Sequence, residues 1–176
     1  MKTLNKINLL LVIAGWMLTH LRVDAAEASL LAFELEATDG TSYTERSWAG
    51  KPLVLLVASS EGVANNAGQV WSRPLHDFFT AHAADVVGVA DVPGVPRLFR
   101  GAARNMAAPD DDDAVRTLLM DWDGEFMPRY GLSRGAYNVL VFDRAGKLVY
   151  TVALRTFSQA QLDGMLRDLQ PIVDAF

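Results

Sequence analysis

Residues 50–59, GKPLVLLVAS, decide the fold of this chain. Residues 53–58 are apolar without interruption, which is typical of a strand that is buried on both faces of a sheet. Residues 85–90, DVVGVA, predict a second strand of this kind. Residues 65–83 carry apolar side chains at helical spacing, and Pro74 predicts that this helix kinks or restarts. A helix between two buried strands indicates a parallel pair in an α/β sheet.

The remaining elements are shorter, and their patterns are read in the same way. We expect strands over residues 30–36, 118–121, 137–143 and 147–154, and helices over 97–106, 125–130 and from Gln159 onward. Residues 143–146, DRAG, form the turn between the last two strands, and Ser158 caps the final helix. The order predicts a mixed central sheet with helices on both faces, in a single domain over residues 27–176.

Residues 1–26 have the features of a secretory signal peptide. Lys2 and Lys6 precede a mostly apolar run over residues 7–18, and small residues follow it. The run is shorter than the roughly 20 residues that a spanning helix needs. We therefore expect cleavage after Ala25, Ala26 or Ala28, a periplasmic protein, and no stable membrane insertion after cleavage. An uncleaved membrane anchor is the alternative.

Composition excludes several classes of function. The chain has 176 residues, 51% of them hydrophobic, and a formal net charge of −5. Such an acidic chain lacks the basic surface that nucleic-acid binding requires. It contains no cysteine, so disulfides, thiolate catalysis and cysteine-based metal sites are impossible. We expect no cofactor.

Three stretches resemble thioredoxin-like proteins of the peroxiredoxin and cytochrome-maturation type. Residues 50–59 are similar to that family's strand before the redox-active turn, and residues 121–132, DWDGEFMPRYGL, are similar to its acidic turn and "YGV" segment. Residues 141–149, VFDRAGKLV, resemble its hairpin "LIDRDGKIV". The resemblance implies a thioredoxin-like fold over the mature chain.

The same resemblance shows which chemical groups are missing. The family's redox cysteines would fall near Glu61 and Ala64, and Tyr137 stands where the family has its cis-proline. Without a thiol there is no thiol–disulfide exchange, and a cis peptide bond before Tyr137 would cost about 2.5–4 kcal/mol, so we expect it to be trans. The chain also resembles the small periplasmic YtfJ family, which brings no activity with it.

Four polar clusters are candidate sites with simpler structural interpretations. Consecutive carboxylates at 110–113 suit the start of a helix better than a cation site, and Asp121 and Asp123 suit a turn better than acid–base catalysis. His76 and His82 are spaced six apart, which does not place them on one helical face, so we expect no metal site there. The fourth cluster is a stripe of arginines that we expect to be a solvated face, with contact to an acidic partner or to lipid headgroups as the alternative: Arg97, Arg100 and Arg104.

The position of the missing redox turn is the candidate binding surface. It combines hydroxyl, amide and carboxylate groups with an aromatic residue that we expect to be exposed. Its residues are Ser60, Glu61, Asn65, Asn66, Tyr137 and Asn138. The alternatives are that Asn65 or Asn66 caps the following helix, and that Tyr137 opens the hairpin strand and packs in the core. We expect a non-redox binding or accessory module with an unknown protein or peptide partner. The alternative is a non-thiol, hydrolase-like enzyme that uses a polar pocket around Glu61, Asn66 and Tyr137.

Overall fold

The fold was analysed in a computed structural model that describes residues 29–59, 63–110 and 113–176, with only the helical backbone described for 63–69. The expected signal peptide, residues 1–26, therefore lies outside the described residues. Within the described part of the chain, no helix is long and apolar enough to cross a membrane.

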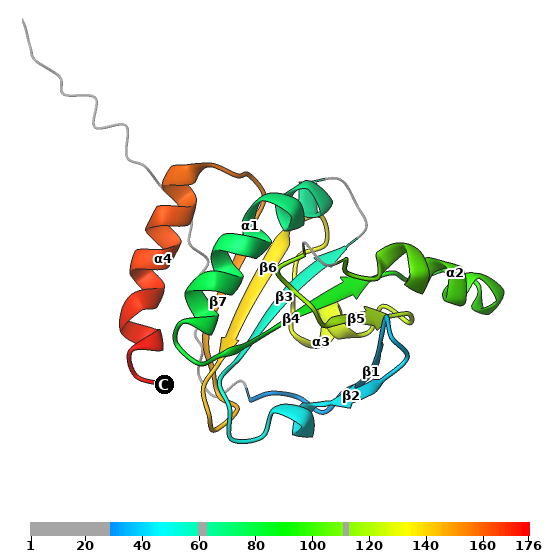
Figure 1. The fold of residues 1–176 in the computed structure, drawn as a ribbon, viewed down its shortest axis with the longest axis horizontal. Helices are drawn as coiled ribbons and strands as arrows, with labels where there is room; N and C mark the ends of the chain where they lie inside the picture. Colours follow the sequence, from blue (N-terminus) through cyan, green and yellow to red (C-terminus); the bar gives the residue numbers. More distant parts are fainter. Residues whose placement is uncertain (1–28, 60–62, 111–112) are drawn as a thin grey trace, which may run out of the picture.

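One seven-stranded sheet forms the centre of the molecule (Figure 1). Its order is β2-β1-β5-β4-β3-β6-β7, with β3, β4 and β5 parallel and every other neighbouring pair antiparallel. The strands are β1 (Glu34–Ala37), β2 (Ser42–Thr44), β3 (Leu53–Ser59), β4 (Asp85–Asp91), β5 (Leu118–Asp121), β6 (Tyr137–Phe142) and β7 (Leu148–Leu154). The expected mixed α/β sheet is thus confirmed.

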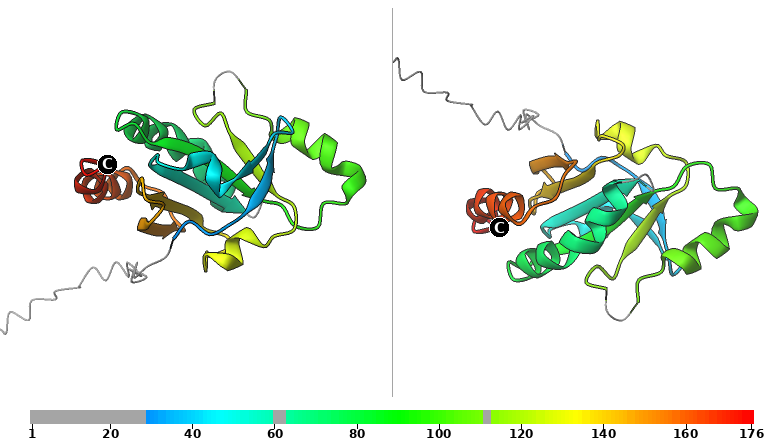
Figure 2. Two further views of the ribbon diagram at one scale, coloured as in Figure 1. Left: turned by 90° about the horizontal axis from the view of Figure 1, so that it is seen from below. Right: turned by 90° about the horizontal axis from the view of Figure 1, so that it is seen from above.

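Helices cover both faces of this sheet. They are α1 (Val63–Thr80), α2 (Arg97–Ala107), α3 (Phe126–Arg129), α4 (Gln159–Val173) and the short 3-10 helix η1 (Glu45–Trp48). Figure 2 shows α1 and α3 on opposite sides of the sheet. Side chains of α1 and α4 share one apolar cluster, whereas those of α3 and η1 belong to the other.

Burial on both faces explains the uninterrupted apolar strands. In β3, Val54 and Leu56 pack toward α1 and α4, while Leu55 and Val57 pack toward α3 and η1. A strand covered on both sides has no face for polar residues, so its sequence does not alternate. Residues 53–58 therefore identified a central strand correctly.

Several sequence expectations change in the structure, and two of them concern the elements described here. Of the two outcomes expected at Pro74, a kink or a restart, the restart does not occur, because α1 runs through Pro74 as one helix. The acidic run at 110–113 does not begin a helix, since residues 113–117 form a loop before β5. In that loop Asp113 accepts a hydrogen bond from the Asp110 backbone at 2.9 Å. A short-range side-chain contact thus competes with helix formation.

Candidate functional site

The three parallel strands each end in a buried polar residue, and the three residues lie in one row. Ser59 of β3 is in register with Asp91 of β4, and Asp91 is in register with Asp121 of β5. Each of the three side chains is at least nine-tenths buried. In open α/β sheets, ligand sites form at the carboxyl ends of parallel strands. This row, Ser59–Asp91–Asp121, is the polar row at that edge.

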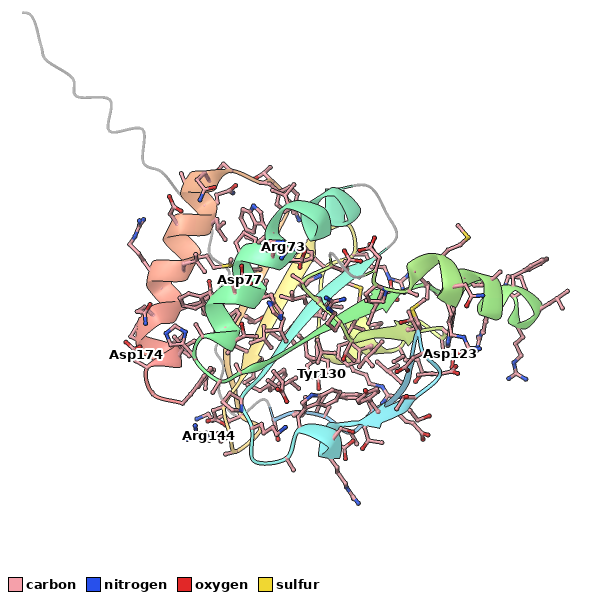
Figure 3. The ribbon with its side chains drawn as sticks, in the orientation of Figure 1. Arg73, Asp77, Asp123, Tyr130, Arg144 and Asp174 are labelled. Atoms are coloured by element: carbon pink, nitrogen blue, oxygen red, sulfur yellow. The ribbon has the colours of Figure 1, made fainter. Side chains whose placement is uncertain are left out.

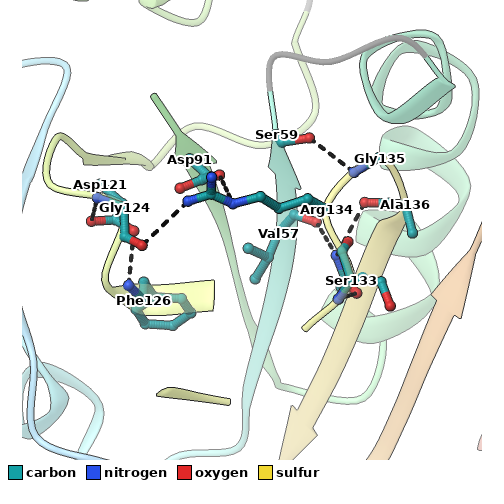
Figure 4. A network of polar contacts seen from close by, with 11 residues as sticks. Val57, Ser59, Asp91, Asp121, Gly124, Phe126, Ser133, Arg134, Gly135 and Ala136 are labelled. Carbon is teal, nitrogen blue, oxygen red and sulfur yellow. Dashed lines mark hydrogen bonds and ion pairs between the residues drawn. The ribbon is translucent and has the colours of Figure 1, made fainter. Parts of the chain in front are cut away.

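The loop 133–136 lies over the row and contacts it at several points (Figure 4). The backbone of Gly135 donates a hydrogen bond to Ser59 Oγ at 3.2 Å. Arg134 Nε lies 3.4 Å from Asp91 Oδ2, and Arg134 Nη2 donates to the Gly124 carbonyl at 3.5 Å. The Arg134 side chain itself is 49% exposed, so the partner of the buried Asp91 carboxylate is in contact with solvent.

Asp121 holds the turn between β5 and α3. Its carboxylate accepts hydrogen bonds from the backbone of Gly124 at 3.0 Å and of Phe126 at 2.8 Å. Asp123 (Figure 3), by contrast, is exposed, and its Oδ1 lies 3.3 Å from Nη2 of Arg100 in the first turn of α2. The two carboxylates have different partners, and Asp121 holds its turn as expected.

Tyr137 and Asn138 are not on the surface, which corrects the expected binding patch. Tyr137 is 3% exposed and packs in the cluster of α1 and α4, because the first residue of the central strand β6 is already covered by helices. Burial raises the pKa of the Tyr137 phenol well above its ordinary value of 10.0. The expectation that Tyr137 is an exposed aromatic anchor is therefore wrong.

Asn138 has a structural role instead. Its side-chain amide lies within hydrogen-bond distance of the carbonyls of Val57 at 3.3 Å and Ala136 at 3.0 Å, and its Oδ1 accepts from the Ser133 backbone at 3.3 Å. These bonds fasten the loop 133–136 to the end of β3. The peptide bond before Tyr137 is trans, as expected.

Of the other four proposed contact residues, the structure describes only the backbone of two. Ser60 and Glu61 lie outside the described residues, and Asn65 and Asn66 lie in α1 where only the backbone is described. A hollow of about 340 Å³ lies along β1 and the turn 121–126, and Asp121 of the polar row is among the residues that line it. His76 contacts Asp77, whereas His82 contacts Gln170 of α4, so the two imidazoles have separate partners.

Sequence reasoning missed Asp91 and Arg134. One available signal was that Asp91 follows a buried strand at the position that matches Ser59 after the first one. Arg134 carried no such signal, because a single arginine in a loop is typical of any exposed turn.

The described residues contain no group of three or more histidines and carboxylates that could hold a metal ion.

The comparisons with known proteins define the class of fold. No family model and no curated protein matches the chain. Solved structures do match, among them one from Chlorobium tepidum assigned as a thiol:disulfide interchange protein DsbE, with a TM-score of 0.62 and 16% identity over 84% of this chain and 96% of that one. Peroxidoxin BcpB from Mycobacterium tuberculosis matches with a TM-score of 0.59 and 20% identity, over 83% of this chain and 96% of that one.

The exposed lipoprotein thioredoxin Etrx1 of Streptococcus pneumoniae is similar at 22% identity and a TM-score of 0.57, over 79% of this chain and all of that one. At such identities the likeness concerns the fold alone. The chain therefore has a thioredoxin-like fold, and it has no cysteine with which to perform thiol redox chemistry.

Proposed function

We propose that this chain is an exported, non-catalytic binding or accessory module that contacts a protein or peptide partner in the periplasm. The features of residues 1–26 support export. The resemblance to the YtfJ family, through the leader, the DRAG hairpin and the leucine-rich last helix, is consistent with this assignment.

One observation carries the proposal: among the described residues, each of the three side chains in the polar row at this edge has a partner within the chain itself. Ser59 Oγ accepts from Gly135, Asp91 is ion-paired with Arg134, and Asp121 caps a turn. A nucleophile or general base needs an accessible atom within hydrogen-bond reach of a substrate. Side chains that are buried and held in this way stabilise the fold and do not offer such an atom.

The proposed contact surface is the rim of that edge. It retains Ser60, Glu61, Asn65 and Asn66 from the sequence analysis, and the half-exposed Arg134 replaces Tyr137 as the side chain that reaches solvent. Arginine is frequent among the residues that dominate binding energies at interfaces. A hydrolase that uses Tyr137 is disfavoured, because burial keeps the Tyr137 phenol neutral and inside the core.

Affinity capture from the periplasm tests the proposal. Cells that express the complete chain with a C-terminal tag are cross-linked, and the proteins recovered with it are identified and quantified. We expect a partner in near-stoichiometric amount, unchanged by Arg144→Ala, an exposed arginine in the hairpin turn. Arg134→Ala should reduce its capture about tenfold or more at a temperature where thermal melting shows this variant to be folded.

A panel of ester, peptide and phosphate substrates is assayed with the same preparation. Turnover that disappears in Asp91→Asn, in a protein whose melting temperature is unchanged, would contradict a non-catalytic role. Capture without any enriched protein would contradict a partner at this rim.

A further inference from the structure

The helix α2 contacts the rest of the domain through the side of the helix that carries its arginines. Arg100 pairs with Asp123, and its guanidinium lies 5.2 Å from the centre of the Trp122 ring. One turn further, Arg104 pairs with Glu36 of β1. The sequence suggested that the arginine stripe is a solvated face. In the structure, Arg100 and Arg104 of that stripe instead attach the helix to the domain. No α2 side chain is buried.

The opposite side of α2 is apolar and points away from the domain. Leu98 is 86% exposed, Phe99 57% and Met106 88%. At about 100° per residue, these side chains share one face with Ala102, across the helix from Arg100 and Arg104. Figure 1 shows α2 projecting beyond the edge of the sheet. An apolar helix face normally packs on a core, so a face held outward by ion pairs indicates a contact surface.

We propose that this α2 face, Leu98–Phe99–Ala102–Met106, is the contact between two copies of this chain. Leu98 and Met106 are each four residues from Ala102, so a two-fold axis near Ala102 would pair each Leu98 with Met106 of the other copy in an antiparallel arrangement. The small side chain of Ala102 at the crossing lets the two helices approach closely. Bulky ends and a small centre thus make the face complementary to itself.

Charge favours a second copy over a lipid surface. The α2 face itself carries no charge, and Arg100 and Arg104 are balanced by Asp123 and Glu36, so two such faces meet without repelling arginines. A membrane-binding helix instead turns free basic side chains toward anionic headgroups.

The area predicts a weak dimer. Covering the exposed parts of Leu98, Phe99 and Met106 removes on the order of 450 Å² per copy from water, against about 800 Å² per partner in a stable interface. We therefore expect reversible association that becomes visible between roughly 10 and 500 µM. This inference concerns α2 alone and does not rest on the proposed partner at the Arg134 rim.

Sedimentation equilibrium of the protein purified from expression of the complete chain tests the pairing. We expect a monomer–dimer equilibrium that Leu98→Glu and Met106→Lys each weaken by about tenfold or more. Val70→Gln is the matched control, because Val70 is an apolar residue on α1 that is 62% exposed. It should leave the dimer unchanged. Circular dichroism verifies that each variant retains its helices.

A mixture of the two single variants tests the antiparallel register. In the mixed dimer, one contact places the carboxylate introduced by Leu98→Glu against the ammonium group introduced by Met106→Lys. The other contact remains Leu98 against Met106, so association returns. A mixture that stays monomeric would overturn the antiparallel pairing. A wild-type protein that is monomeric up to roughly 500 µM would overturn the dimer. Binding of that monomer to phosphatidylcholine vesicles, lost in Leu98→Glu, would assign the face to lipid instead.

Discussion

At the scale of single residues, Asp91 and Asp123 illustrate how burial decides the role of a carboxylate. Asp91 is 2% exposed and lies at the strand ends, so water cannot take the place of Arg134 as the partner of its carboxylate. Asp123 forms a similar ion pair with Arg100, but its side chain is 77% exposed. Exposed pairs contribute little to stability, typically about 0–1 kcal/mol. Substitution of Asp91 therefore tests the buried ion pair, and substitution of Asp123 is its control.

Tyr137 provides a prediction about alkaline stability. Its pKa is raised by burial, so the folded state favours the neutral phenol. The resulting stability is complete below the ordinary pKa of about 10 and is lost as the pH rises above it, by up to about 1.4 kcal/mol per pH unit. In Tyr137→Phe this loss is absent. Urea unfolding of both proteins between about pH 8 and 11 measures it, and identical pH dependences would show that Tyr137 ionises freely.

The residues that the sequence misjudged share one cause. Tyr137 and Asn138 were expected at an exposed edge because the resemblance places the residues before the hairpin beside the former redox turn. In the structure they begin a strand that lies between β3 and β7 under two helices. Whether a strand's first residue is covered depends on elements far away in the sequence, here α1 and α4. The sequence around Tyr137 therefore does not predict that α1 and α4 cover it.

At the scale of elements, the turn between β5 and α3 depends on a glycine that meets two constraints. Gly124 has φ +69°, a backbone conformation that side chains disfavour, and a Cβ there would lie 2.9 Å from the Cβ of Pro93. Gly135 has φ +72° but no heavy atom within 4 Å of such a Cβ. The two positions separate backbone strain from close contact.

We expect Gly135→Ala to lower the free energy of unfolding by about 1 kcal/mol, and Gly124→Ala by roughly 2–4 kcal/mol. Chemical denaturation of both variants measures the difference. Equal losses would mean that Pro93 moves aside at no cost and that the approach between the turn and the end of β4 is loose.

The elements that the sequence predicted well are those with both faces buried or with strong local turns. Residues 53–58, 85–90 and 118–121 became strands, and Ser158 caps α4 by accepting a hydrogen bond from the Gln161 backbone at 3.2 Å. The direction in which α2 faces was not predictable. An amphipathic helix normally buries its apolar side, and only the partners Glu36 and Asp123, distant in sequence, reverse it.

At the scale of the whole molecule, the chain joins an expected export leader to a thioredoxin-like domain without a thiol. We predict that cell fractionation recovers a protein that starts near Glu27 from the periplasm, because residues 1–26 have a basic start, a short apolar run and small residues before the cleavage site. Mass spectrometry of the purified protein locates its first residue. A full-length protein recovered only with membranes would favour the uncleaved anchor.

The central claim is that the polar row Ser59–Asp91–Asp121 holds the fold together and performs no catalysis. Equilibrium unfolding of Asp91→Asn, with Asp123→Asn as its control, tests this claim most directly. We predict that Asp91→Asn lowers the free energy of unfolding by about 1–3 kcal/mol, since a buried charge partner is lost, while Asp123→Asn changes it by less than about 0.5 kcal/mol. Catalytic carboxylates are often kept at the expense of stability. An Asp91→Asn protein as stable as the wild type, or more stable, would contradict the claim.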